Sequence, residues 1–409
     1  MSAAPDTIYR NRDFASFISG RFLSTIAMQV QSVAIGWQIY SITHSTFALG
    51  LVGLCQFGPM FLLTLPAGDI SDRFDQRKVF GASLAVQGIC SALFLALTLS
   101  HVTAEVPFYA VLVLFGAARG FSGPAGSSLI AFLVPPEKLP RAIAASSSAF
   151  TTAVIAGPAL GGFLYALGPV STYSVCVVGY LAAATIMTVL GGRKREHSVS
   201  EATRLERVAE GIAFVRKRPV VLGAISLDLF AVLLGGAVAL LPVYARDILH
   251  TGPIGLGFLR SAPAIGAALV SLTFARKPLE RHAGISMFAC VAIFGLATIV
   301  FGLSVNFYLS LAALFILGAS DMVSVFIRSS LIQLATPDAM RGRVSSVNML
   351  FIGASNELGE FESGITASWF GAVPAVVIGG IGTLAIVAIW MALFPPLRKV
   401  DRLNEVAVV

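Results

Sequence analysis

A series of long apolar blocks separated by short polar segments constrains this chain more than any other feature. Twelve such blocks occur, and each has about the 20 apolar residues that a helix needs to cross the hydrocarbon core of a bilayer. They lie at about 14–37, 48–68, 79–99, 107–133, 142–165, 172–191, 219–244, 253–275, 283–303, 307–335, 344–370 and 374–395. Only 12% of the residues are charged, about half the share in soluble proteins. The sequence therefore predicts an all-α integral membrane protein with twelve transmembrane helices.

The positions of lysine and arginine indicate how the chain is oriented in the membrane. Most of the 28 Lys and Arg fall at the N-terminus, in the even-numbered connections and in the C-terminal tail, whereas the odd-numbered connections contain only Arg246. Positive charge is enriched on the cytoplasmic side of membrane proteins, so both termini are expected to be cytoplasmic. The same bias accounts for the net charge of +7 without a nucleic-acid partner. The polar N-terminal residues and the length of the first block predict no cleavable signal peptide.

Residue types that carry metal or covalent chemistry are sparse and scattered. The five His lie in connections or at block ends without the spacing of a metal site, and no phosphate-binding GxxxxGK[ST] loop occurs. The four Cys lie singly inside apolar blocks and are expected to be buried hydrophobic residues. The sequence thus predicts no enzyme, no metal ion and no cofactor, and it excludes ATP-driven transport by this chain alone.

The longest connection, residues 192–218, divides the chain into an N-terminal half (1–191) and a C-terminal half (219–409), each with six blocks. Its apolar residues fall on one face of a helix, with charged residues opposite; they are Leu205, Val208, Ile212 and Val215. This pattern predicts an amphipathic linker helix at the cytoplasmic surface.

The two halves repeat each other. Gly116-Ala117 recurs as Gly318-Ala319, and the segment Ser127–Ile130 recurs as Ser329–Ile332, both at a spacing of 202 residues. A parallel repeat of two six-helix halves is one of the architectures of secondary transporters. The repeat therefore favours a transporter over a channel or a receptor.

The stretch 68–78, GDISDRFDQRK, concentrates charge in the cytoplasmic turn between the second and third helices. Its acid and bases at fixed spacing, together with the first glycine, resemble the signature loop of the major facilitator superfamily; they are Gly68, Asp72, Arg73, Arg77 and Lys78. In that family the loop is a cytoplasmic latch that docks its acid on the start of helix eleven. The resemblance implies this role for Asp72, with the turn after Arg341-Gly342-Arg343 as its partner. Asp75 and Gln76 depart from the family pattern, which usually has glycine and a base there.

A second motif is similar to one found in exporters of this superfamily. Gly157, Pro158, Gly161 and Gly162 of the fifth helix resemble its GPxxGG motif. Glycines along one face let two helices approach closely, and proline bends the helix, as expected of a helix that packs differently in two states. The loops VPPEKLPRAIAAS and ATPDAMRGRVSSVN, with NELGEFESG, are most similar to the enterobactin-exporter and drug-efflux branch. The resemblance implies the major facilitator fold and a bacterial cytoplasmic (inner) membrane protein.

Charged residues inside the blocks are the candidate functional residues, because each costs about 2.5–3.5 kcal/mol or more at the bilayer centre. Arg21, Arg119, Asp228 and Asp321 lie in the first or fourth helix of a half, and in the family these helices line the central cavity. They are candidates for the substrate cavity, and the two Asp are also candidates for proton transfer. The alternative is that these residues form structural ion pairs. Arg328 is expected to pair with Asp321 or to guard the cytoplasmic mouth.

The eleventh block carries three carboxylates, Glu357, Glu360 and Glu362. Glu357 and Glu360 share one face of a helix, and like charges held close together in a poorly hydrated site favour protonation of one of them. All three are candidates for proton coupling, with Glu360 first. The alternative is that one of them forms a fixed pair with Arg260 or Arg21, while another faces water.

Together these features predict a proton-coupled secondary active transporter that exports a small organic molecule, siderophore-like or drug-like, by alternating access. The alternative is a proton-coupled uptake symporter of the same fold. The expected partners are the small-molecule substrate, protons and the lipid bilayer, and the protein is expected to be a monomer.

Overall fold

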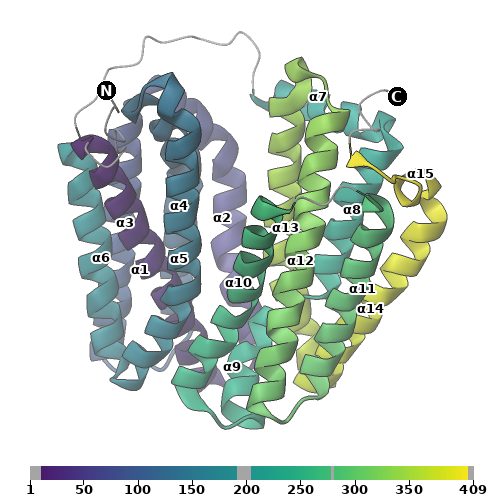
Figure 1. Ribbon diagram of the computed structural model, residues 1–409. Coiled ribbons are helices and arrows are strands. Elements are labelled where there is room, and N and C mark those ends of the chain that lie inside the picture. Colours follow the sequence, from purple (N-terminus) through teal and green to yellow (C-terminus); the bar gives the residue numbers. More distant parts are fainter. Residues whose placement is uncertain (1–10, 191–203, 278–280, 404–409) are drawn as a thin grey trace, which may run out of the picture. The chain divides into compact units, whose positions relative to one another are not determined.

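The computed structural model describes residues 11–190, 204–277 and 281–403. These residues are almost entirely helical and contain no strand (Figure 1). This confirms the all-α prediction. The helices are α1 (Arg12–Thr43), α2 (Thr46–Arg73), α3 (Gln76–Leu99), α4 (Val106–Leu133), α5 (Leu139–Ala166), α6 (Pro169–Val189), α7 (Arg204–Lys217), α8 (Pro219–Leu234), α9 (Leu241–Val243), α10 (Gly252–Arg276), α11 (Ala283–Leu303), α12 (Phe307–Ala335), α13 (Asp338–Phe370), α14 (Ala372–Leu393) and α15 (Pro395–Arg398).

Ten stretches of the described chain are long and apolar enough to cross a membrane, which defines a multi-pass membrane protein. The two long helices outside this set are α1 and α13. Polar side chains inside them lower their hydropathy: three glutamines in α1 and three glutamates in α13.

The described residues group into two compact units. Unit 1 contains residues 11–43 and 55–190, and unit 2 contains residues 44–54 and 204–403. In unit 1, α3 packs on α4 and α6, and α1 packs on α5 and α6. Buried polar side chains join these helices: Ser91 Oγ donates to Gln31 Oε1 (2.5 Å), and Tyr173 Oη donates to Gln38 Oε1 (2.6 Å). Such bonds are expected inside a bilayer protein, where polar groups find no water.

In unit 2, α10 and α11 both pack on α12, and α13 and α14 pack on α8.

The predicted helix 219–244 is not continuous. α8 ends at Leu234, and the chain continues through Gly235-Gly236 into a 3-10 turn (Ala237–Leu240) and then α9. Two successive glycines lower the cost of leaving the helical conformation, which accounts for a break in a stretch that is apolar throughout.

The linker helix α7 belongs to unit 2 and lies at the same end of it as α15 (Figure 1). Its apolar residues Val208, Ile212 and Val215 pack against Val344 and Val347 of α13, in a cluster that α8 completes. These three residues of the predicted apolar face of α7 are therefore covered by protein, and the side chain of the fourth, Leu205, lies outside the described residues.

Four of the five histidines form bends between helices. His44, His101, His250 and His282 all have backbone φ angles of 50–59°, the left-handed region that few residues adopt. Each of them lies where the chain turns from one helix to the next.

Candidate transport site

The carboxylates of α13 lie in the part of that helix that packs on the end of α8. Gly359 makes this packing close, because a Cβ at this position would lie 2.9 Å from the carbonyl oxygen of Val232. The contact fixes the segment that carries Glu357 and Glu360 at i, i+3 spacing. Both carboxylates act electrostatically on Arg260 of α10, which also belongs to unit 2. The structure thus brings two of the three predicted proton-coupling residues together with one cation.

The carboxylate of Glu360 also meets the first turns of α2. A Cβ on Gly53 would lie 3.2 Å from Glu360 Oε2 and 3.3 Å from Glu360 Cβ. One turn earlier, Gly50 lies against Gly364 of α13, where a Cβ on Gly364 would be 2.6 Å from the Cα of Gly50. Glycine at position 53 leaves Glu360 the space in which its carboxylate lies.

Glu362 has a different environment. Its Oε1 accepts a hydrogen bond from Thr366 Oγ1 (2.7 Å), one turn along the same helix. The structure therefore separates Glu362 from the other two by giving it a local hydrogen-bond donor.

Asp321 lies in α12 and is partly buried. One turn before it, α12 makes close contact with α10, because a Cβ on Gly318 would lie 2.0 Å from the carbonyl oxygen of Pro263. This candidate is therefore held on a tightly packed pair of helices in unit 2.

Asp228 forms an ion pair with Arg328, and both residues are buried, 6% and 1% exposed. The prediction that Arg328 pairs with Asp321 is wrong, and its alternative, that Arg328 guards the cytoplasmic mouth, stays a prediction. The physical reason for the error is the position of α8 beside α12, which brings Asp228 to Arg328 inside an apolar cluster that includes Leu227 and Ile327. A buried guanidinium needs a carboxylate, and Asp228 supplies it.

Arg21 of α1 contacts α5 in unit 1, and residues next to Arg21 in the sequence line an open cavity between these helices. Its Nη1 donates a hydrogen bond to Ser146 Oγ (3.1 Å), and its guanidinium lies 5.8 Å from the ring centre of Phe150. The cavity of about 440 Å³ is lined by Ile18, Ser19, Phe22, Leu23, Ala149 and Thr152. The lining combines apolar side chains with two hydroxyls, as small-molecule pockets commonly do.

Arg119 of α4 is held by a side chain from α2. Its Nη1 donates to Gln56 Oε1 (3.3 Å), and a Cβ on neighbouring Gly116 would lie 2.1 Å from the backbone oxygen of Gln56. Arg21 and Arg119 therefore occupy two separate polar environments of unit 1.

Part of the predicted cytoplasmic latch is described. Asp75 caps the start of α3 by accepting a hydrogen bond from the backbone N–H of Arg77 (3.0 Å), and it forms an ion pair with the Arg77 side chain (2.9 Å). Burial raises the pKa of Asp75, but hydrogen bonds and charge from Arg77 outweigh this effect and leave that pKa below its ordinary value. Arg77 Nη1 also donates to the carbonyl oxygen of Leu190 (2.8 Å).

The residue that departs from the family pattern, Asp75, thus engages Arg77 through its carboxylate. Lys78 is exposed. Gly68, Asp72 and Arg73 lie in α2, but their side chains fall outside the described residues, so the docking of Asp72 stays a prediction.

The helix-five motif faces α1. Gly157, Pro158, Gly161 and Gly162 are all buried, and a Cβ on Gly161 would lie 3.0 Å from the Cα of Val30. The motif lets the backbones of α1 and α5 approach closely. In the described part of the chain, no three His, Cys, Asp or Glu residues gather at a position that could hold a metal ion.

The fold and the membrane spans first define a class, multi-pass all-α membrane proteins whose helices are arranged as in major facilitator structures. The structure aligns with that of a POT family transporter in complex with 5-aminolevulinic acid (TM-score 0.75, 13% identity, 95% of this chain and 97% of that chain). It also aligns with a mutant of the nucleoside transporter NupG (TM-score 0.74, 11% identity, 93% of this chain and 100% of that chain). At these identities the likeness concerns the fold alone.

The sequence comparison is more specific. Enterobactin exporter EntS from Escherichia coli O1:K1 and its counterpart from Shigella boydii serotype 18 are each 28% identical to the chain over 385 residues, which is 91% of this chain and 85% of the relative. The pattern of the family described as transmembrane secretion effector matches residues 3–408. The chain therefore belongs to this family of major facilitator transporters. The resemblance read from its motifs is confirmed, as is the prediction that it is a transporter rather than an enzyme.

Two contacts at the site were not expected from the sequence. They are the contact of Gly53 with Glu360 and the hydrogen bond from Arg119 to Gln56. Both depend on which helices become neighbours. Arg260 was named from the sequence as a possible partner of one glutamate, and in the structure both Glu357 and Glu360 act on it electrostatically.

Proposed function

We propose that the protein is a proton-coupled secondary active transporter that exports a small organic molecule across the bacterial inner membrane by alternating access. In this proposal twelve helices in two six-helix repeats cross the bilayer, both termini are cytoplasmic, and the monomer is the working unit. The observation that carries the proposal is the pair Glu357 and Glu360 on one face of α13, acting on one cation, Arg260. Export is supported by the relative EntS, which is an enterobactin exporter.

The charge of this group explains how it serves proton coupling. Two ionised carboxylates and one guanidinium carry a net charge of −1, and one bound proton makes the group neutral. Neutral groups move into a poorly hydrated state at much lower cost than charged ones. Glu360 is the proposed carrier because its carboxylate lies against Gly53, so a shift of α2 changes its surroundings. Asp321 is the second candidate, and Asp228 serves the ion pair with Arg328.

For the substrate we propose a site that includes the cavity beside Arg21. A guanidinium next to apolar side chains and two hydroxyls favours an organic molecule with an acidic or phenolic group. Enterobactin is the first compound to test, because it is the substrate named for the relative.

The test uses inside-out membrane vesicles with an acidic interior and a pH-sensitive dye. Enterobactin, an organic acid and the cationic drug ethidium are added outside the vesicles in separate runs. A proton-coupled exporter exchanges internal protons for the added compound, so its substrate collapses the gradient. The wild type is compared with Glu360→Gln and with the matched variant Glu362→Gln on the same helix.

We expect one compound to collapse the gradient in the wild type and in Glu362→Gln but not in Glu360→Gln. Collapse in all three proteins would remove Glu360 as the carrier and direct the test to Asp321→Asn. If no compound collapses the gradient, but a compound loaded inside leaves together with protons, the protein is an uptake symporter and the proposal of export is wrong.

A further inference from the structure

The linker helix α7 is fixed to the start of α13 by an ion pair and by close backbone packing. Glu210 of α7 pairs with Arg343 of α13. The neighbouring Gly211 is buried against the same turn, because a Cβ there would lie 2.8 Å both from the carbonyl oxygen of Arg343 and from Val347 Cγ2. A side chain at position 211 would therefore push α7 away from Arg343.

The energies of the two contacts differ. The apolar cluster under α7 removes Val215, Val344 and Val347 from solvent almost completely, and this burial supplies the attraction between the helices. The side chains of Glu210 and Arg343 remain 50% and 35% exposed, so their ion pair adds little stability. Its effect is to orient the Arg343 guanidinium.

The orientation of the Arg343 guanidinium matters because of where Arg343 lies in α13. It is in the first turns of α13, next to the segment on which the cytoplasmic latch is expected to dock Asp72. Arg341, two residues earlier, has a different partner: its Nε donates a hydrogen bond to the carbonyl oxygen of Gln333 in the preceding helix, α12 (3.0 Å). Glu210 is the acid on α7 that holds the Arg343 guanidinium.

The other end of the connection between the halves shows a related contact. Arg77, a residue of the latch loop, donates a hydrogen bond to the carbonyl oxygen of Leu190, just after the end of α6. The chain that joins the halves is therefore attached to the latch loop where it leaves unit 1 and to the start of α13 where it enters unit 2. Each attachment lies within one unit.

We propose that Glu210 and Gly211 of α7 are positioning residues for Arg343, and that this attachment sets the balance between the two cytoplasmic states of the transporter. The linker helix then takes part in the conformational change, beyond joining the halves. The inference rests on the alternating access of the proposed function, but it concerns the balance of the two states and needs neither substrate nor a proton gradient to be measured.

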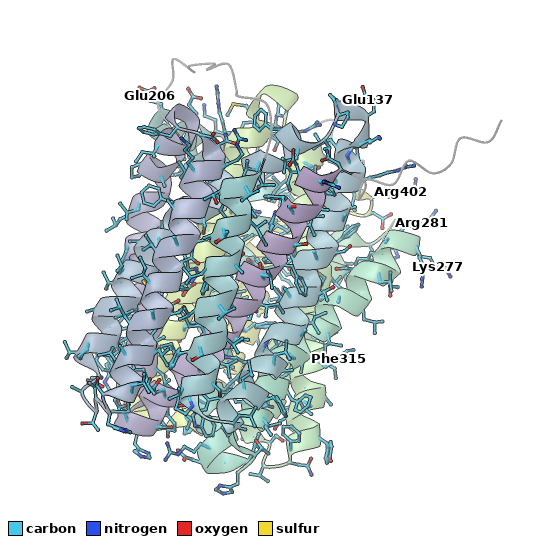
Figure 2. All side chains as sticks on the ribbon, turned by 90° about the vertical axis from the view of Figure 1, so that its left-hand side faces the viewer. Glu137, Glu206, Lys277, Arg281, Phe315 and Arg402 are labelled. Atoms are coloured by element: carbon cyan, nitrogen blue, oxygen red, sulfur yellow. The ribbon has the colours of Figure 1, made fainter. Side chains whose placement is uncertain are left out.

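The test measures that equilibrium directly. Spin labels are placed at Glu137→Cys and Lys277→Cys, both exposed (Figure 2), after replacement of the four native cysteines. The distance distribution is recorded by pulsed electron–electron resonance in lipid nanodiscs. Glu210→Gln and Arg343→Gln are compared with the exchanged pair Glu210→Arg with Arg343→Glu. Arg216→Gln, an exposed position on α7, is the control.

We expect each single variant to change the ratio of the two populations by about two- to fivefold in the same direction, the size that loss of an exposed ion pair gives. The exchanged pair should return the ratio toward that of the wild type, and Arg216→Gln should leave it unchanged. Populations that do not change in Glu210→Gln, or a change that the exchanged pair does not reverse, would overturn the proposal.

A second measurement keeps the test clear if a variant is unstable. Hydrogen exchange of the α7 backbone should rise in Gly211→Val, which cannot seat against Arg343, and stay at the wild-type rate in Gly342→Val, where a Cβ meets no atom within 4 Å. Unchanged exchange in Gly211→Val contradicts the docked position of α7. Because neither readout uses substrate, a failure here is distinct from a failure of the export proposal.

Discussion

Arg328 and Asp228 form a buried ion pair that joins α12 to α8. Arg328 is among the largest fully buried side chains of the described chain, and apolar residues of α8, α11 and α12 surround the pair. Such a pair contributes little net stability, because both charges lose their hydration. Each charge nevertheless lowers the cost of burying the other. The pair therefore requires these two helices to be neighbours.

Removing one member of this pair should destabilise unit 2 strongly. We expect Arg328→Met to lower the free energy of unfolding by about 3–5 kcal/mol, because Asp228 is left buried without a counter-charge. The double variant Asp228→Leu with Arg328→Met should recover most of the loss. Unfolding in detergent measures both, with the exposed Arg276→Gln as the control; equal stability of Arg328→Met and wild type would contradict a buried pair.

Adding a side chain at Gly53 should disturb proton coupling through Glu360. Gly53→Val places atoms where the Glu360 carboxylate now lies, since even a Cβ comes within 3.2 Å of Oε2. We expect a severalfold loss of substrate-driven proton flux and a shifted pH profile. Gly58→Val on the same helix is the matched control, because a Cβ there meets nothing within 4 Å. Equal flux in the two variants would show that Gly53 does not position the carboxylate.

The charge of Asp75 should stabilise unit 1 near neutral pH and lose this effect in acid. Its pKa in the folded protein is below the ordinary value of about 3.9, so the ionised form stabilises the fold above that value, and the contribution is lost as the pH falls through the lower folded pKa. Asp75→Asn keeps a helix-capping side chain but removes the charge.

We therefore expect Asp75→Asn to unfold at a lower temperature than the wild type at pH 7, with the difference shrinking toward pH 3. Thermal unfolding across this range measures it. Asp247→Asn, where the acid is 3.9 Å from Arg246, should show little change. A difference that stays constant with pH would contradict the role of the charge.

If Asp72 acts in the latch, its replacement should reduce transport without affecting membrane insertion. Asp72→Asn should insert into the membrane normally, because one fewer acid does not alter the bias of Lys and Arg that sets topology. Transport should fall severalfold, because the uncharged amide is a poorer partner for a helix N-terminus. Protease accessibility of the termini and vesicle transport measure the two properties. Normal transport in this variant would remove the latch.

The all-α fold was predictable because long apolar blocks in a chain with so few charges have one stable solution, the membrane-spanning helix. The break after Leu234 was not predicted, since Gly235-Gly236 lies in a stretch whose hydropathy gives no sign of it. At the site, the i, i+3 spacing of Glu357 and Glu360 predicted their shared face. Arg260 was one of two cations named as a possible partner. That both carboxylates act on it depends on where α10 lies relative to α13, which residue spacing in the sequence does not give.

The same limit explains the error at Arg328. Asp321 is seven residues away on the same helix and was the obvious partner by sequence. Asp228 is a hundred residues earlier, and it became the partner because α8 packs on α12. Local periodicity predicts faces of helices, whereas ion pairs between helices follow from the packing order.

The histidine bends have a consequence for chemical labelling. A reagent such as diethyl pyrocarbonate, which acylates imidazole rings, will modify groups at the corners of the chain when it reaches His44, His101, His250 or His282. Loss of transport after such treatment would report distorted corners in the connections, even though imidazole is the group usually suspected when protons move at neutral pH. Replacement by asparagine, which tolerates the same left-handed backbone, would separate the two explanations.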